Sequence, residues 1–191
     1  MKKRIAFVAV FFMVSVLSGC AWQRIPPAPA YTAEAPLPLH VGVILDGSPA
    51  STYYGPGVLN EWKEMRLFDS LVYPYREGDK VDAVMKLSIK GGWVGHGAGA
   101  GFIIGLTLGL ASPVIGPSMT GTHDALAILS KSTNEAGRYF AQVSSTVEWG
   151  MGANTGEVSN KADELQRKRI AFELANKIRA DRQVLLSRLG K

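Results

Sequence analysis

The alternation of apolar and polar side chains changes its period several times along the chain. Apolar residues recur at every second position in residues 39–46 and 81–90, which predicts two strands that each turn one face toward a core. Between these strands, residues 47–57 are dense in glycine, proline and serine, and residues 58–68 carry apolar side chains at helical spacing. This pattern predicts a loop, a helix and then a short strand over residues 69–75.

The second half of the chain also predicts strands followed by a helix. Residues 123–132 predict a strand that is buried on both faces at its centre, residues 134–137 a hairpin loop, and residues 138–149 an alternating strand. After a glycine-containing loop, a long helix is predicted to start near Ser159 or Asn160. Its apolar stripe consists of Leu165, Ala171, Leu174, Ala175, Ile178, Leu185 and Leu189.

The predicted order is strand, helix, strand, strand, insertion, strand, strand, helix. One mostly antiparallel sheet with the helices packed on one face accommodates this order. We therefore predict an α+β domain over residues 39–191, with an insertion at 91–121 that is rich in glycine and apolar residues. The roughly 150 residues involved are enough for one core.

The first twenty residues are organised as an export signal. Residues 2–4 are all basic and precede an apolar run over residues 5–17, which is the order of a secretory signal peptide. The run is too short to cross a bilayer comfortably as a permanent helix. It ends in Leu17-Ser18-Gly19-Cys20, and Cys20 is the only cysteine of the chain. A disulfide within the chain is therefore excluded.

Leu17-Ser18-Gly19-Cys20 resembles the lipobox of bacterial lipoproteins. The resemblance implies that residues 1–19 are a cleaved signal peptide and that Cys20 carries diacylglycerol on its sulfur and an acyl chain on its new amine. The alternative is an ordinary signal peptide with an incidental cysteine. Ala21 stands where aspartate would resemble the inner-membrane retention signal of enteric bacteria. The resemblance thus implies an outer-membrane protein, lipid-anchored and facing the periplasm.

Residues 20–38 contain the lipidated cysteine and a proline-rich segment. Half of the ten prolines lie between Ala21 and Pro38, which favours extended polyproline II geometry and a reach of roughly 55 Å. We expect a tether between the lipid and the domain. Trp22 either sits among lipid headgroups or is an unremarkable linker residue. Together with this anchor, the element order is similar to the α+β domains of the curli-secretion lipoprotein and the TolB N-terminal domain.

Removal of the leader changes the charge of the protein. The formal charge of +5 includes the three leader cations, so the chain from Cys20 carries 18 basic and 16 acidic side chains. Residues 160–191 contain nine of those basic and four of those acidic side chains. The high isoelectric point therefore gives no support for a nucleic-acid partner, and none is predicted.

No pattern in the sequence specifies an enzyme or a metal centre. His40, His96 and His123 do not share a metal-ligand spacing. His123 and Asp124 are adjacent at a strand start, so their side chains point to opposite faces and predict a structural or exposed histidine. The glycines at 95–101 lack the Lys-Ser/Thr pair of a phosphate-binding loop. We predict no catalytic residue, metal or other cofactor.

A stripe of glycines occupies the insertion. Gly97, Gly101, Gly105 and Gly109 recur at every fourth position and would share one side of a helix. This stripe resembles the glycine-zipper segments of bacterial outer-membrane lipoproteins, which implies membrane or oligomer contact. The apolar residues expected to share in that contact are Phe102, Ile103, Leu106 and Leu110. A buried helix of the domain and a flexible loop are the two alternatives.

The sequence therefore predicts a lipid-anchored, non-enzymatic protein of the cell envelope. We expect it to act in assembly or interaction, with membrane lipid bound through acylated Cys20. Self-association or another envelope protein is the expected further partner. The alternative is a ligand-binding or accessory lipoprotein of an envelope transport system.

Overall fold

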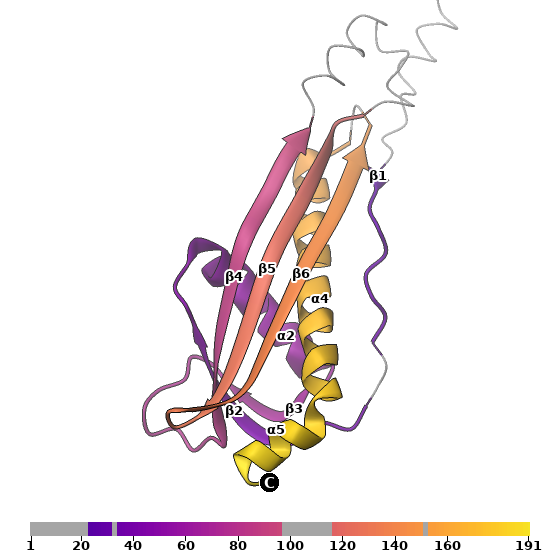
Figure 1. The fold of residues 1–191 in the computed structure, drawn as a ribbon. Helices are drawn as coiled ribbons and strands as arrows, with labels where there is room; N and C mark the ends of the chain where they lie inside the picture. Colours follow the sequence, from indigo (N-terminus) through magenta and orange to yellow (C-terminus); the bar gives the residue numbers. More distant parts are fainter. Residues whose placement is uncertain (1–22, 32–33, 97–115, 151–152) are drawn as a thin grey trace, which may run out of the picture. The chain divides into compact units, whose positions relative to one another are not determined.

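The structure is a computed structural model of the 191-residue chain. It describes residues 23–31, 34–96, 116–150 and 153–191 (Figure 1). The predicted signal peptide, the lipobox cysteine and the glycine stripe lie outside the described residues.

The described residues form one mixed six-stranded sheet with three helices. The strands are β1 (Gln23–Arg24), β2 (Leu37–Leu45), β3 (Phe68–Val72), β4 (Ala83–His96), β5 (Ser118–Lys131) and β6 (Asn134–Trp149). The helices are α2 (Pro49–Glu64), α4 (Thr155–Ala180) and α5 (Arg182–Leu189). Their order in the sheet is β1-β6-β5-β4-β2-β3. The predicted α+β class is confirmed.

The sheet combines antiparallel and parallel pairs. β1 is antiparallel to β6, whereas β2 is parallel to both β3 and β4. Across β5 and β6, the hydroxyls of Thr120 and Thr146 lie 3.0 Å apart, and Gln142 donates to Asp124 at 3.1 Å. Partner numbers that rise on one strand as they fall on the other define an antiparallel hairpin.

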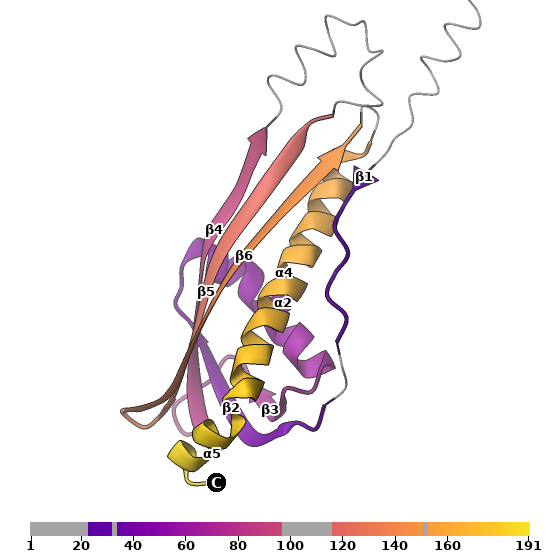
Figure 2. The ribbon, with the colours of Figure 1, turned by 45° about the vertical axis from the view of Figure 1, so that its right-hand side comes forward.

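The β5–β6 hairpin turns two residues before the predicted loop. Lys131 ends β5, Asn134 begins β6 (Figure 2), and Ser132 between them has a positive φ of 55°. The prediction of a loop at 134–137 was wrong because Gly137 is a strand residue. Its missing Cβ leaves room for the ring of Tyr139, so glycine here marks close packing and no turn.

Helix α2 begins inside the segment predicted as a loop over 47–57. The Ser48 hydroxyl accepts the N–H of Ser51 at 3.2 Å, and proline occupies the first helical turn. A serine N-cap followed by proline is a strong start signal. Gly55 is buried against the side chain of Leu45. Tertiary packing and a good cap therefore outweigh the turn-forming composition of this segment.

Three other boundaries differ from the predictions. β2 starts at Leu37, two residues earlier than expected, and α4 starts at Thr155, where the Asn154 side chain accepts the N–H groups of the first turn. Residues 91–96 and 118–121 were assigned to the insertion but belong to strands. Glycines in these residues interrupt the apolar alternation, so the ends of β4 and β5 could not be predicted from it.

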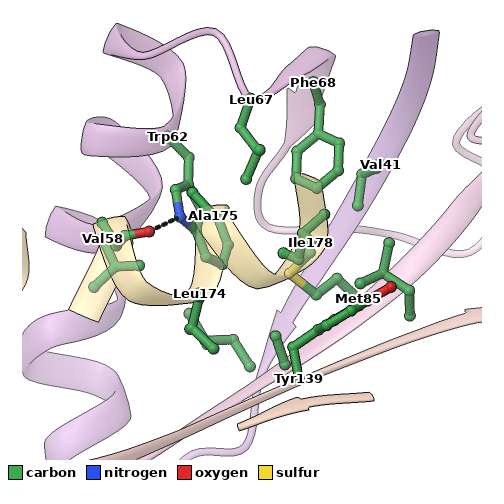
Figure 3. Packing of buried hydrophobic residues seen from close by; sticks show 14 of the residues in the cluster. Val41, Val58, Trp62, Leu67, Phe68, Met85, Tyr139, Leu174, Ala175 and Ile178 are labelled. Atoms are coloured by element: carbon green, nitrogen blue, oxygen red, sulfur yellow. Dashed lines mark hydrogen bonds between the residues drawn. The ribbon is translucent and has the colours of Figure 1, made fainter. Parts of the chain in front are cut away.

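The chain divides into two compact units, which we call unit 1 and unit 2. Among the described residues, unit 2 comprises 27–31, 34–92, 121–145 and 163–191. It contains the main core, to which α2, α4 and α5 contribute buried side chains, and Figure 3 shows Trp62, Leu174 and Ile178 packed in it. Trp62 is fully buried and donates its indole N–H to the carbonyl of Ala171 at 2.9 Å.

The predicted apolar stripe of the C-terminal helix is confirmed, because all seven residues named for it are buried. The single long helix was wrong, since α4 ends at Ala180 and α5 starts at Arg182. Asp181 lies at the break and accepts the hydroxyl of Tyr139 at 2.8 Å. The break brings a second short helix onto the same core through Leu185 and Leu189.

Basic side chains of the helices lie along one edge of β6. Arg188, Lys177 and Arg169 donate to the carbonyl oxygens of Ala136, Phe140 and Ser144 at 3.0, 2.6 and 3.1 Å. The accepting residues are spaced four apart, so their carbonyls point to the same side of the strand. We call these three contacts the edge bonds of β6.

Candidate functional site

Unit 1 is where the chain leads toward both segments predicted to meet lipid. Its described residues are 23–26, 93–96, 116–120, 146–150 and 153–162. β1 begins only three residues after Cys20, while β4 ends and β5 begins on either side of the glycine stripe. Within unit 1, the Ser118 hydroxyl donates to the carbonyl of His96 at 3.5 Å.

β1 is fixed to the sheet immediately after Cys20. Gln23 is paired with Trp149 and Arg24 with Glu148. Arg24 also forms an ion pair with Glu148 at 3.2 Å, and Lys161 donates to the side chain of Gln23 at 3.4 Å. These exposed polar contacts contribute little energy, but the backbone pairing sets where the chain leaves the sheet.

This pairing shortens the tether expected for residues 20–38. The first paired residue follows Cys20 by three positions, which limits the separation to about 10 Å. Further along, Tyr31 packs against the core of unit 2 and donates to Glu61 at 2.8 Å. The described residues of this segment are thus attached to the folded part of the chain at both places.

Unit 1 contains a small apolar cluster. Val147, Val158 and Ala162 are almost completely buried in it. Five apolar side chains pack against this cluster and remain partly exposed: Ile25, Trp93, Met119, Trp149 and Ala153. Two indoles at the rim of a small core are an unusual use of large side chains, since aromatic residues normally contribute most to closed cores.

A buried polar network lies in unit 2. The hydroxyls of Tyr53 and Tyr54 both donate to Asp163 at 2.7 Å. The ring of Tyr54 also meets the His123 ring edge-on, with centroids 4.6 Å apart. Gln166 donates to the Gly121 carbonyl at 2.9 Å and accepts from Ser145 at 3.2 Å. These contacts tie α2, β5, β6 and α4 together.

The electrostatics of this network follow from its burial. Burial lowers the pKa of His123, opposed by the charges of Asp163 and Asp124. Hydrogen bonding to Asp163 raises the pKa of Tyr53. His123 is fully buried while Asp124 is exposed, so the prediction that the two adjacent side chains point to opposite faces is confirmed. The sequence missed Asp163, because its tyrosine partners lie in the segment predicted as a loop.

Unit 2 has two open hollows. One, of about 310 Å³, is lined by Pro27, Pro29, Gln142, Val143, Ser144, Arg169, Phe172 and Glu173. The other, of about 420 Å³, is lined by Pro36, Lys63, Arg66, Phe68, Asp69, Ser70 and Leu71. In the first hollow the Arg169 guanidinium is already bonded to Ser144 and Ser145. Arg169 is therefore held as part of the wall.

The residues predicted for lipid or oligomer contact lie outside the part of the chain that the structure describes. They are Cys20, Gly97, Gly101, Phe102, Ile103, Gly105, Leu106, Gly109 and Leu110. Of the predicted histidines, His40 and His96 are exposed, and the His40 ring lies 2.7 Å from the Ser70 hydroxyl. Within the described ranges, no three His, Cys, Asp or Glu side chains gather as metal ligands.

The helices of the described residues include none that is long and apolar enough to span a bilayer. No family model matches the sequence, and no curated protein matches it either.

Several solved structures are similar to this chain. A Caulobacter crescentus protein provisionally assigned as a lipoprotein is 15% identical, with a TM-score of 0.41, over 77% of this chain and 90% of that chain. Rare lipoprotein B from Shewanella oneidensis is 10% identical, with a TM-score of 0.41, over 80% of this chain and 99% of that chain. A Xanthomonas campestris protein of the DUF330 family is 12% identical, with a TM-score of 0.39, over 80% of this chain and 88% of that chain. Similarity at this level carries no inference about function.

Proposed function

We propose that this chain is a lipid-anchored, non-enzymatic protein of the bacterial cell envelope. Acylated Cys20 holds it at the outer membrane facing the periplasm, and its α+β domain acts in assembly or interaction. The observation that carries the proposal is Leu17-Ser18-Gly19-Cys20 behind a basic and then apolar leader. Several acyl chains on one residue give stable anchoring, at about 0.8 kcal/mol per buried CH₂.

The arrangement of unit 1 supports the proposal. The residue that begins β1 follows Cys20 by three positions, and the strands that flank the glycine stripe end in the same unit. Both proposed lipid-contact segments are thus attached to one small part of the protein.

Substitution of Cys20 tests the anchor. Cys20→Ser removes the thiol that would be linked to diacylglycerol. We therefore expect loss of acylation and either release of the mature chain or an uncleaved precursor. Incorporation of a fatty-acid analogue is the measurement. Incorporation by the serine variant equal to that of the wild type would contradict the lipoprotein assignment.

The glycine stripe is proposed to mediate self-association in the membrane. Gly101→Leu combined with Gly105→Leu raises helix propensity but would separate two closely packed backbones. We expect the lipidated double variant to lose crosslinks in membranes while its melting stays normal. A large drop in the melting temperature would instead indicate that the glycines pack inside the domain. If neither the crosslinks nor the melting temperature changes, the glycines have no packing role.

The hollow of about 310 Å³ favours a second candidate function, that of a ligand-binding or accessory lipoprotein. Its volume is at the lower end of the range for small-molecule sites. Mass spectrometry of the lipidated chain purified in detergent separates the two functions. A stoichiometric co-purifying small molecule favours the second, whereas oligomers without a ligand favour the first.

A further inference from the structure

We propose that Trp149 contacts the headgroup layer of the bilayer directly, with Met119 and Ile25 behind it, as a second and non-covalent attachment of unit 1. This inference rests on the proposed function, because it takes Cys20 as acylated. It adds a lipid-contacting surface made of described residues, which we call the tryptophan end of unit 1.

The position of Trp149 follows from the length of chain between the lipid and the sheet. Gln23 is paired with Trp149, and Cys20 precedes Gln23 by three residues. Three residues span at most about 10 Å. The headgroup layer on each side of a bilayer is about 5–7 Å thick. An acylated Cys20 therefore keeps Trp149 next to the headgroups.

The register of the strands orders the other apolar side chains behind Trp149. The Trp149 N–H donates to the Pro117 carbonyl at 3.2 Å, which places these residues opposite each other. The same register puts Met119 opposite Val147, one row further along. The Ser118 hydroxyl lies 3.5 Å from the His96 carbonyl, which places the end of β4 level with the start of β5.

His96 is then level with Glu148, and Trp93 lies three residues further from that end of the strands. Four residues of strand separate this level from Trp149, which is about 13 Å. With the strand ends toward the lipid, Trp93 lies beyond the headgroup layer. The two indoles share one cluster but differ in the predicted depth, so Trp93 is the matched control for Trp149.

The chemistry of the tryptophan end suits a lipid interface. An indole has an apolar body and a polar N–H, which is why tryptophan concentrates at membrane–water interfaces. The charged side chains of the described part of unit 1 are two basic, Arg24 and Lys161, and two acidic, Glu148 and Glu157. The contact therefore does not depend on anionic lipid.

Fluorescence quenching by lipid tests the depth order. The lipidated protein is placed in phosphatidylcholine vesicles brominated near the headgroup end of the acyl chains. One variant carries Trp22→Phe and Trp93→Phe, and the other carries Trp22→Phe and Trp149→Phe. Both keep Trp62, which is fully buried.

We expect the variant that keeps Trp149 to lose roughly half of its emission, since one of its two indoles lies at the interface. The variant that keeps Trp93 should lose almost none. Trp22→Phe alone leaves unit 1 unaltered and should lose roughly one third of its emission, from one of three indoles. The losses should be the same in vesicles that contain phosphatidylglycerol.

Two failures are distinguishable. Protein that does not float with the vesicles and carries no acyl chain overturns the proposed function together with this inference. Acylated protein that floats, but whose Trp149 is unquenched or is quenched no more than Trp93, overturns the inference alone. In that case the tryptophan end is a contact for another protein or a second copy.

Discussion

Unit 1 and unit 2 use strands of the same sheet but close their apolar faces to different degrees. In unit 2, three helices cover the strands and side chains such as Trp62, Leu174 and Ile178 have no exposed surface. Among the described residues of unit 1, the cover comes from the first turns of α4 and the short strand β1, and two tryptophans stay partly exposed. The difference indicates that unit 2 supplies the stability and unit 1 supplies a surface.

The largest effect is expected from truncation of the core of unit 2. Leu174→Ala or Ile178→Ala removes a fully buried side chain and should lower the free energy of unfolding by about 2–5 kcal/mol. Val184→Ala is the control, since Val184 is 45% exposed on α5. Urea unfolding measures the three variants. Unchanged stability of both core variants would mean that α4 is not docked.

A smaller loss is expected from the polar network of unit 2. Asp163→Asn leaves two tyrosine hydroxyls with a weaker acceptor and should cost about 1–3 kcal/mol. Glu164→Gln is the matched control, because Glu164 only forms an exposed ion pair with Lys168. Equal urea midpoints for the two variants would argue against a structural role for the network.

Truncation in unit 1 sharpens the comparison. Val158→Ala removes two methyl groups from the buried cluster of unit 1 and should cost about 1.5 kcal/mol. The cluster is open at its rim, so neighbouring side chains can move into the space. A loss as large as that of Leu174→Ala would show that unit 1 is as tightly closed as unit 2.

Acid acts on unit 2 through His123. Burial lowers the pKa of His123 in the folded chain, so the unfolded chain binds the proton more readily. The histidine therefore contributes stability above its unfolded pKa near 6.5, and this contribution is lost as the pH falls below that value. The charges of Asp163 and Asp124 oppose the effect.

We expect His123→Gln to weaken the decline of stability between pH 7 and pH 5, whereas His40→Gln, at an exposed position, should preserve it. Thermal melting across this pH range is the measurement. A wild-type chain whose melting temperature does not fall on acidification would contradict the assignment.

The smallest effect has the opposite sign. Arg66 follows helix α2 with a positive φ of 49°, and its N–H donates to the carbonyl of Lys63 at 3.2 Å. Glycine adopts this left-handed conformation without steric cost. Arg66→Gly should therefore raise the free energy of unfolding by about 0.5–1 kcal/mol. Lys63→Gly, which places glycine inside the helix, should lower the free energy of unfolding by about 1 kcal/mol. Urea midpoints that move the same way would contradict this account.

Much of the fold was predictable because residues buried in strands and helices recur along the sequence with the period of each element. The α+β class, the order of the main elements and the apolar stripe of the C-terminal helix all follow from this record. Errors arose where one residue type serves two purposes. Pro49 and Gly55 suggested a loop, but Pro49 begins helix α2 and Gly55 packs closely against Leu45. Gly137 suggested a turn but accommodates Tyr139.

The candidate site was less predictable than the fold. Trp93, Met119 and Trp149 are separated widely in the sequence, and only strand register brings them to one cluster. Glycines around Trp93 also hid the end of β4 from the periodicity. Asp163 was missed, because its partners Tyr53 and Tyr54 belong to a part of helix α2 that the sequence predicted as a loop.

The edge bonds of β6 have a consequence for many copies of this chain held on one surface. β1 pairs with only two residues of β6, so most of this outer edge carries no neighbouring strand among the described residues. Uncovered edges recruit strands from other molecules, and sheets then grow without limit. Arg188, Lys177 and Arg169 occupy the carbonyls that an incoming strand would need. The proposed lipid anchor would concentrate copies of the chain in a plane, and the three cations would then keep their sheets from pairing edge to edge.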